Sequence, residues 1–215
     1  MRVIPVEGLP EIPPGADLAD LLAAATSFEE GDVLVVSHKV VSKAEGRVVR
    51  GEKLDAVLGE AKRIVRRRGD FVIAETRHGF ICASAGVDAS NAPEPGSLVL
   101  LPLDPDDSAA RLRERLGVAV IISDSFGRPW RLGTTDVAIG VSGLAPLLDL
   151  RGQTDPVGYE LRATVIAVAD EIAAAADLVK GKTEGIPAAI VRGLSLSGEG
   201  TARDLVMPAE RDLFR

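Results

Sequence analysis

Short apolar runs alternate along the chain with longer segments in which apolar residues recur every three or four positions. The short runs are rich in valine and isoleucine, a composition that favours β-strands. These predicted strands are residues 3–6, 32–37, 71–74, 80–85, 97–101, 118–122, 137–141 and 188–191. The alternation of strands with helices predicts an α+β fold with mixed sheets and flanking helices.

The longer segments predict four helices. The first is capped by Asp17 and ends near residue 25, and the second spans 54–68, where three arginines at 66–68 complement its dipole. Asp107 or Ser108 caps the third, which ends near Leu116. The fourth carries apolar residues at helical spacing from 165 to 179, with Gly181 as a left-handed C-cap. No repeat or long linker divides the chain, so we expect one domain over 1–215, with two intertwined subdomains as a variant of it.

Composition excludes several classes of protein. An apolar content of 46% with 27% charged residues is typical of a soluble globular chain. A net charge of −7 and only 3% aromatic residues argue against nucleic-acid binding. No apolar run approaches the roughly 18 residues needed to span a bilayer, and residues 1–5 do not resemble a signal peptide. The single cysteine, Cys82, lies in an apolar stretch that predicts a buried thiol, and we expect a cytoplasmic protein.

The most informative segment is 118–143, where a polar sequence follows an apolar strand. We expect Ser123, Asp124 and Ser125 to form a charged turn, with Gly127, Arg128 and Pro129 breaking the backbone. A carboxylate at a strand end beside a turn is a common place to hold a metal or a phosphate. Arg128 and Arg131 offer donors to an anion. The alternative for the segment is an ordinary surface turn, and the alternative for the two arginines is a structural pair that binds backbone carbonyls.

Asp88 repeats this arrangement, since it follows another apolar run and precedes Ser90 and Asn91. Two such carboxylates with neighbouring hydroxyl and amide oxygens suit Mg²⁺ or Mn²⁺. The alternative is that Asp88 and Ser90 only cap their own turn. His38, Lys39 and Lys43 follow the strand at 32–37, where a lysine can serve as a phosphate donor and His38 is more often a neutral surface residue.

Several familiar motifs are missing. Gly181, Lys182 and Thr183 imitate the end of a phosphate loop, but position 176 is alanine and the segment follows a helix instead of opening one. No GxGxxG or GxSxG occurs, and Phe126 stands where a DxD phosphatase needs its second aspartate. Without HxxxH or CxxC spacing, a zinc site is not expected.

Many short motifs, in the same order, closely resemble the coenzyme F420-0:L-glutamate ligase family almost from end to end. They are Gly8-Leu9-Pro10-Glu11-Ile12, Asp32-Val33-Leu34-Val35-Val36, Val41-Ser42-Lys43-Ala44-Glu45-Gly46-Arg47, Ala85-Gly86-Val87-Asp88-Ala89-Ser90-Asn91, Ser123-Asp124-Ser125-Phe126-Gly127-Arg128, Ala138-Ile139-Gly140-Val141-Ser142-Gly143, Gly158-Tyr159-Glu160-Leu161, Val168-Ala169-Asp170-Glu171 and Ile186-Pro187 through Val191-Arg192-Gly193.

The resemblance implies a GTP-dependent ligase that adds L-glutamate to the phospholactyl carboxylate of the deazaflavin F420-0 and extends it by a γ-glutamyl bond through an acyl phosphate. It also implies a homodimer and two Mg²⁺ or Mn²⁺ sites, with K⁺ as an additional candidate. A metal-dependent phosphohydrolase and a deazaflavin-binding module without catalysis are the alternatives.

The resemblance also assigns roles to residues. It gives Asp88, Asp124 and Ser125 metal-binding roles, to which we add Glu184 as a candidate ligand, and our candidate catalytic residues are Asp88, Asp124 and Lys43. The GTP contacts that it implies are Leu9, Pro10, Glu11, Ile12, His38, Lys39, Lys43, Asn91, Gly181, Lys182, Thr183 and Glu184. Arg128 and Arg131 are our candidates for the anionic substrates.

Three positions depart from the family pattern. The family carries small hydroxyl residues where His38 and Lys39 stand, and an acidic residue for the second metal where this chain has Lys182. We expect Glu184 to replace that residue. The segment 207–215 resembles the junction at which some members continue into a flavin-binding domain, and we assign it no flavin or reductase activity.

Overall fold

The computed structural model describes residues 1–196 and 198–214. Its main element is a five-stranded mixed sheet in the order β1-β12-β2-β8-β9. The strands are β1 (Arg2–Val6), β2 (Val33–Ser37), β8 (Ala119–Arg128), β9 (Arg131–Ser142) and β12 (Ala188–Arg192). The pair β2 and β8 is parallel and the other neighbours are antiparallel, which confirms the predicted α+β class with mixed sheets.

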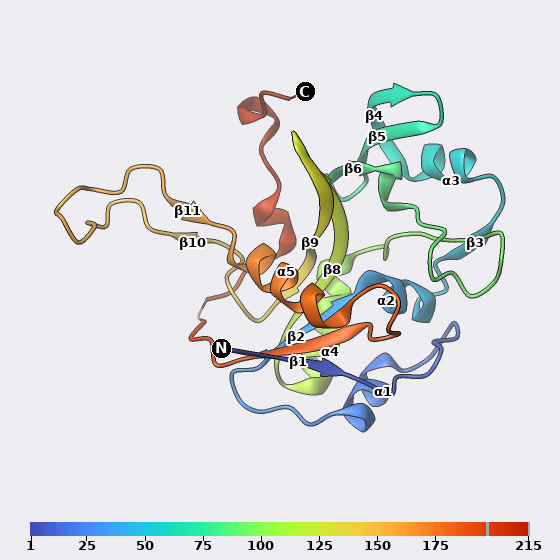
Figure 1. Ribbon diagram of the computed structural model, residues 1–215, viewed down its shortest axis with the longest axis horizontal. Helices are drawn as coiled ribbons and strands as arrows, with labels where there is room; N and C mark the ends of the chain where they lie inside the picture. The colour runs from blue at the N-terminus through green and yellow to red at the C-terminus, as the bar shows by residue number, and fades with distance from the viewer. Residues whose placement is uncertain (197, 215) are drawn as a thin grey trace.

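Helices cover both faces of this sheet. In Figure 1, α5 (Val168–Lys180) crosses in front of the strands and α4 (Pro105–Leu116) lies behind them. The central strand β2 is consequently buried on both faces, from Val33 to Val36. Two shorter helices, α1 (Leu18–Ala25) and α2 (His38–Ala44), also flank the sheet.

Side-chain caps fix where two of the helices begin. The Asp17 carboxylate accepts a hydrogen bond from the Asp20 N–H (3.0 Å), as predicted. The predicted cap of α4 is wrong, because Asp104 occupies that position and accepts from the Asp107 N–H (3.1 Å). Pro105 follows it in the first turn, where a residue without an N–H is tolerated.

A smaller unit occupies residues 48–100 and has its own core. It contains β3 (Val48–Arg50) paired with β7 (Ser97–Val99), α3 (Lys53–Glu60), and a three-stranded sheet of β4 (Ala61–Arg68), β5 (Phe71–Thr76) and β6 (Ile81–Ala83), followed by a 3₁₀ turn at Ser84–Gly86. This second core is formed by Val57, Val72, Ala74, Ala85, Val87, Leu98 and Leu100. The chain therefore leaves the larger core after α2, contributes Phe80 to it, and rejoins it at Leu101, before α4.

The predicted helix over 54–68 is wrong in its second half. The helix ends at Glu60, and residues 61–68 form β4 antiparallel to β5. Across this pair Glu75 accepts from Lys62 (2.9 Å) and Arg63 (3.1 Å), so pairing with β5 outweighs the local helical pattern. The three arginines at 66–68 lie on the edge strand β4, which Figure 1 shows at the top of the molecule, and do not end a helix.

The turn predicted at Asp124 is also wrong. Strand β8 continues past Ile122 to Arg128, and the chain reverses between Arg128 and Arg131 to form a long hairpin with β9. A break in register between Ile122 and Ser123 marks a bulge in this strand. The polar residues that follow lie within the strand because the hairpin extends beyond the sheet, as Figure 1 shows.

A ribbon of β10 (Leu148–Asp149) and β11 (Val165–Ile166) projects from the body in Figure 1. Consequently α5 begins at Val168 and not at residue 165. Gly181 has a positive φ of 62°, but its ψ of −169° is not left-handed helical, so the predicted C-cap geometry is wrong.

The segment 207–214 follows the short 3₁₀ helix Ala202–Leu205, includes another at Ala209–Arg211, and lies against the hairpin, while Arg215 lies outside the described residues. Within the described ranges, no helix is long and apolar enough to cross a bilayer.

Candidate functional site

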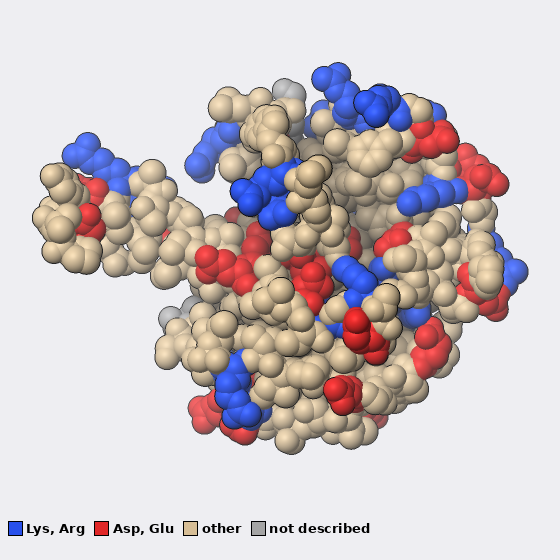
Figure 2. Space-filling model, viewed as in Figure 1, with Lys and Arg blue, Asp and Glu red and all other residues tan. Residues whose placement is uncertain are grey.

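A cavity of about 900 Å³ opens where the parallel strands β2 and β8 end their pairing, at Ser37 and Ser123. Ligands commonly bind at the carboxyl ends of such strands. The predicted site residues that line it are Leu9, Pro10, Glu11, Ile12, Lys39, Lys43, Asp88, Asn91, Asp124, Ser125, Gly181, Lys182 and Thr183. Segments far apart in the sequence thus converge on one cavity, where Figure 2 shows acidic and basic side chains side by side near the middle of the face.

Helix α2 places two lysines one turn apart at this cavity. Lys39 Nζ lies 2.7 Å from Asp88 Oδ2, and Lys43 Nζ lies 2.6 Å from Glu11 Oε1. Both lysine side chains are mostly buried, whereas the Glu11 carboxylate is largely exposed. These ammonium groups are held at the cavity wall, where they can bind an anion such as a phosphate.

The Asp88 carboxylate is hydrogen-bonded within its own turn, as the capping alternative predicts. Its oxygens accept from the Ser90 N–H (2.8 Å) and the Ser90 hydroxyl (2.9 Å). Burial opposes ionisation of Asp88, but the hydrogen bonds from Lys39 and Ser90 outweigh it and lower the pKa to about 2. Asp88 caps a turn and also presents a carboxylate to the cavity.

Asp124 lies beside a buried histidine. Its Oδ1 accepts from the Ser125 N–H (2.8 Å) and stands 3.2 Å from His38 Nε2, which is not aligned for a hydrogen bond. His38 is 1% exposed, so the prediction of a surface histidine is wrong. It does not line the cavity, because α2 turns its ring toward Asp124 and Ser42.

Asp136 and Lys180, which we did not predict, form a buried ion pair at the cavity wall. Each is 3% exposed, and Lys180 Nζ lies 2.7 Å from Asp136 Oδ2. The hydroxyl groups of Ser123 (2.8 Å) and Ser125 (2.6 Å) donate to the same carboxylate. Burial opposes ionisation of Asp136, but the charge and hydrogen bond of Lys180, together with the two serines, lower its pKa.

Two sequence signals could have identified this pair. Lys180 stands four residues after Ala176, on the apolar stripe that faces the core, where a lysine needs a buried partner. Asp136 precedes the apolar run of β9 as Asp124 follows that of β8, and the two strands pair Ser125 with Asp136. Recognising the hairpin would have placed the second carboxylate opposite the first polar segment. Asp177, Thr134 and Ser37 also line the cavity without having been predicted.

The loop after α5 brings a lysine where an acidic residue was expected in the family. Lys182 Nζ donates to Ser125 Oγ and lies 3.7 Å from Asp136 Oδ1 and 3.8 Å from Asp177 Oδ1. Glu184 does not line the cavity. Its carboxylate folds back to accept from the Thr183 N–H (3.0 Å) and hydroxyl (2.9 Å). The structure therefore places a cation, and no Glu184 oxygen, beside Ser125.

Arg128 and Arg131 lie at the exposed end of the hairpin and line neither this cavity nor the apolar one below. Arg128 donates to the Leu132 carbonyl (3.3 Å), which is the structural role that the alternative assigned to it.

The oxygen donors of the cavity fit a hard divalent cation by their chemistry. Asp88, Asp124 and Ser125 supply carboxylate and hydroxyl oxygens from two segments. Among the described residues, no three His, Cys, Asp or Glu side chains gather closely enough to hold a metal by themselves. The two carboxylates, Asp88 and Asp124, suit Mg²⁺ or Mn²⁺, which typically take one or two carboxylates and complete their shell with water and phosphate oxygens.

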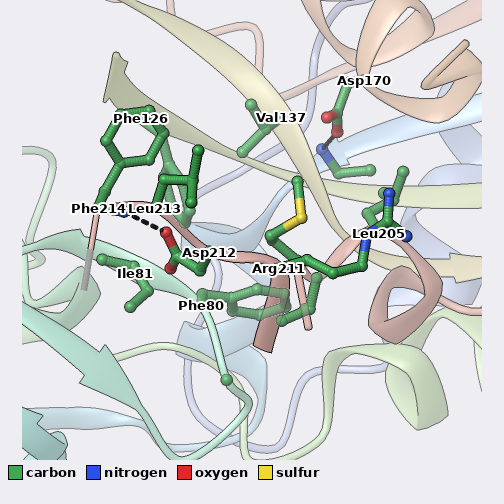
Figure 3. A pocket seen from close by; sticks show the side chains of 14 residues that line it. Phe80, Ile81, Phe126, Val137, Asp170, Leu205, Arg211, Asp212, Leu213 and Phe214 are labelled. Atoms are coloured by element: carbon green, nitrogen blue, oxygen red, sulfur yellow. Dashed lines mark hydrogen bonds between the residues drawn. The ribbon is translucent and has the colours of Figure 1, made fainter. Parts of the chain in front are cut away.

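A second, apolar cavity of about 480 Å³ lies between the hairpin, β6 and the C-terminal segment. Figure 3 shows Phe80, Phe126 and Leu213 around it, together with Arg211. Phe126 follows Ser125 along β8, and successive side chains of a strand face opposite sides. The hairpin therefore separates the polar cavity from the apolar one. Three of the five phenylalanines in the chain, at 80, 126 and 214, line this space.

Cys82 and His78 lie outside the polar cavity. The thiol is buried, as predicted, and burial raises the pKa of Cys82 to about 12. Burial has the opposite effect on His78, because the charged form of histidine is the protonated one, and it lowers the pKa of His78. The Nε2 atom of His78 lies 3.0 Å from the Pro102 carbonyl oxygen.

Comparison with known proteins identifies relatives over the whole chain. Residues 8–193 match the family described as F420-0:Gamma-glutamyl ligase. A protein named Coenzyme F420:L-glutamate ligase from Methanopyrus kandleri is 43% identical, and the alignment covers 100% of this chain and 98% of that protein. Proteins of the same name from Methanothermobacter thermautotrophicus and Archaeoglobus fulgidus are 42% and 43% identical, with 100% of this chain and 99% and 96% of theirs covered. The chain therefore belongs to the F420-0:gamma-glutamyl ligase family.

Proposed function

We propose that this protein is a GTP-dependent amide ligase that joins L-glutamate to the phospholactyl carboxylate of F420-0 and extends the product by a γ-glutamyl bond. The names of its relatives support ligation of glutamate to this coenzyme. The observation that carries the proposal is one cavity in which Lys39, Lys43 and Lys182 stand beside Asp88 and Asp124. Such a mixture of charges suits phosphates, a divalent cation and an amino-acid substrate together.

The chemistry requires an activated carboxylate, because a free carboxylate is a poor electrophile at neutral pH. A carboxylate oxygen of F420-0 attacks the γ-phosphorus of GTP, GDP leaves, and an acyl phosphate forms. The amine of glutamate then attacks the acyl carbon, and inorganic phosphate departs with that oxygen. Asp88, Asp124 and Ser125 would hold a divalent cation, which neutralises phosphate charge when bound.

The two lysines of α2 have different roles in this reaction. Lys43 is buried, and its partner among the described residues is the exposed Glu11 carboxylate, which a phosphate can displace. Lys39 lies against Asp88 and so places positive charge next to the proposed metal site. Both groups orient the triphosphate and stabilise the charge that develops during phosphoryl transfer.

The apolar cavity is our candidate binding site for the deazaflavin ring. Its volume is within the usual range for small-molecule sites, and aromatic side chains favour a flat ring. Arg128 and Arg131 lie at the tip of the hairpin that separates the two cavities, and they are our candidates for the phosphodiester.

We also propose that the protein works as a homodimer. The ribbon of β10 and β11 exposes Leu148, Val157, Tyr159 and Val165, and such apolar side chains on a projecting arm favour a protein interface. Light scattering after size exclusion is expected to give twice the chain mass, and a monomer at micromolar concentration would contradict this assembly.

The test is incubation of the protein with F420-0, GTP, Mn²⁺ and L-glutamate, followed by mass spectrometry of the deazaflavin. We expect a mass gain of one or more glutamyl residues that depends on every component. A metal-dependent phosphohydrolase would release phosphate without glutamate, and a binding module would change neither substrate. Either of those results would overturn the ligase proposal.

A further inference from the structure

The buried cluster beneath the polar cavity fixes the direction of each hydrogen bond in it. An ionised carboxylate only accepts, and an ammonium group only donates. Lys180 Nζ donates to Asp136 Oδ2 (2.7 Å) and to Ser123 Oγ (2.7 Å). The Ser123 hydroxyl therefore donates its own hydrogen bond to Asp136 Oδ2, at 2.8 Å. No other arrangement of these protons satisfies every partner.

The same reasoning fixes the orientation of Ser125. Its hydroxyl proton points to Asp136 Oδ1, at 2.6 Å. A hydroxyl has one proton and two lone pairs, so the lone pairs of Ser125 remain for the cavity side. In the structure Lys182 Nζ donates to this oxygen, which shows that a cation can approach it. Ser125 is therefore held as an acceptor.

Stability alone is a poor reason for burying this ion pair. Removing two charges from water is costly, and apolar residues of similar size often stabilise a fold as well or better. Lys180 nevertheless ends an apolar helix stripe formed by Ala169, Ile172, Ala173 and Ala176. Its position at the wall of the cavity suggests that the pair is retained for the site.

We propose that Asp136 and Lys180 are positioning residues, which lock the Ser125 hydroxyl as an oxygen ligand for a cation bound in the polar cavity. This inference rests on the proposed function, in which that cation is divalent. Asp136 Oδ1 accepts the hydrogen bond of the Ser125 hydroxyl, and Lys180 holds the other carboxylate oxygen in place. Hydrogen-bonded partners of this kind often change metal affinity by 10- to 100-fold when removed.

The test measures Mn²⁺ binding by electron paramagnetic resonance, with the metal alone and with a non-hydrolysable GTP analogue. We expect Ser125→Ala and Asp136→Asn each to weaken Mn²⁺ binding by about ten-fold or more. The amide of Asp136→Asn can turn its NH₂ toward Ser125 and occupy the lone pairs that face the cation.

The double variant Asp136→Asn/Lys180→Met separates positioning from a purely structural role. It leaves no unpaired buried charge, so we expect its melting temperature to recover toward that of the wild type. Its Mn²⁺ affinity should stay as weak as that of Asp136→Asn. Recovery of both properties would overturn the proposal, because the pair would then serve the fold alone.

A matched control is available at the other end of β2. Asp32 is equally buried and accepts from Arg192 Nε (2.7 Å) and Nη2 (2.8 Å), far along the strand from the cavity. Asp32→Asn should lower the melting temperature without changing Mn²⁺ affinity. Absence of Mn²⁺ binding to the wild-type protein would also overturn the inference. Failure of the ligase proposal would be seen separately, as a missing glutamyl mass gain.

Discussion

Lys39 and Asp88 form an ion pair of 2.7 Å that joins α2 to the turn where the smaller core meets the polar cavity. The ammonium group also donates to Ser90 Oγ at 2.6 Å. The carboxylate that we assign to a metal is therefore neutralised by a lysine when no metal is bound. A cation entering the site has to compete with this ammonium group.

Replacing Lys39 with methionine should consequently have opposite effects on two ligands. Mn²⁺ should bind the nucleotide-free protein more tightly, by up to about ten-fold, because one charge-assisted hydrogen bond no longer competes. The KM for GTP should rise by a similar factor, because a phosphate donor is lost. Calorimetric titration with Mn²⁺ and steady-state kinetics with GTP check the two effects. Unchanged Mn²⁺ affinity would mean that Asp88 is not a metal ligand.

Asp124→Ala should abolish ligation and leave the protein folded. The carboxylate is partly exposed to the cavity, where it accepts from the adjacent Ser125 N–H and has His38 Nε2 at 3.2 Å, so we expect its removal to leave the fold intact. We expect a loss of at least about 1,000-fold in kcat, comparable to the loss of other groups that stabilise transition-state charge. Mass spectrometry of the product and thermal melting measure the two properties. Activity within ten-fold of the wild type would remove Asp124 from the mechanism.

Phe126→Leu should weaken the deazaflavin substrate specifically. Leucine keeps most of the apolar volume but loses the ring face, which contributes about 0.5–1.5 kcal/mol to a stacked pair. The KM for F420-0 should therefore rise roughly three- to ten-fold, with GTP binding unchanged. Phe71→Leu serves as the control, because Phe71 is 59% exposed on the smaller unit. Equal effects of the two variants would argue against a ring site in the apolar cavity.

Cys82 should make stability depend on alkaline pH. Its pKa is raised from 9.0 to about 12 in the folded protein, so between these values the unfolded chain loses the thiol proton first. The free energy of unfolding is therefore unaffected by this thiol below pH 9. It falls progressively as the pH rises toward 12, by at most about 4 kcal/mol.

Urea unfolding of the wild type and of Cys82→Ala at pH 8 and pH 10 isolates this effect. All other titrating groups are present in both proteins, so their contribution cancels in the comparison. The wild type should lose more stability than the variant over this interval. At pH 8 the folded thiol should also resist alkylation until the protein is unfolded. Rapid alkylation of the folded protein would contradict the assignment of a buried, protonated thiol.

The order of elements and much of the site could be predicted because they depend on local sequence. The apolar runs at β2, β8 and β12 identified the sheet, and Asp17 identified a helix start through its own hydrogen bond. The carboxylates at 88 and 124 were recognisable because each follows an apolar run, and the structure brings both to one cavity.

The remaining features depend on partners that local sequence does not reveal. Residues 61–68 have a helical pattern, but their pairing with β5 turns them into a strand. Lys180 follows an apolar stripe, and only the fold shows that Asp136 meets it. His38 was wrongly predicted to be exposed, because the burial of α2 against the sheet depends on tertiary packing, which cannot be inferred from one polar residue in the sequence.

The central claim is that phosphoryl transfer from GTP activates the carboxylate of F420-0. The most direct test uses F420-0 labelled with ¹⁸O in that carboxylate, together with GTP, Mn²⁺ and L-glutamate. Our account predicts that one ¹⁸O atom appears in the inorganic phosphate for each amide bond formed. Amide formation with unlabelled phosphate would contradict it.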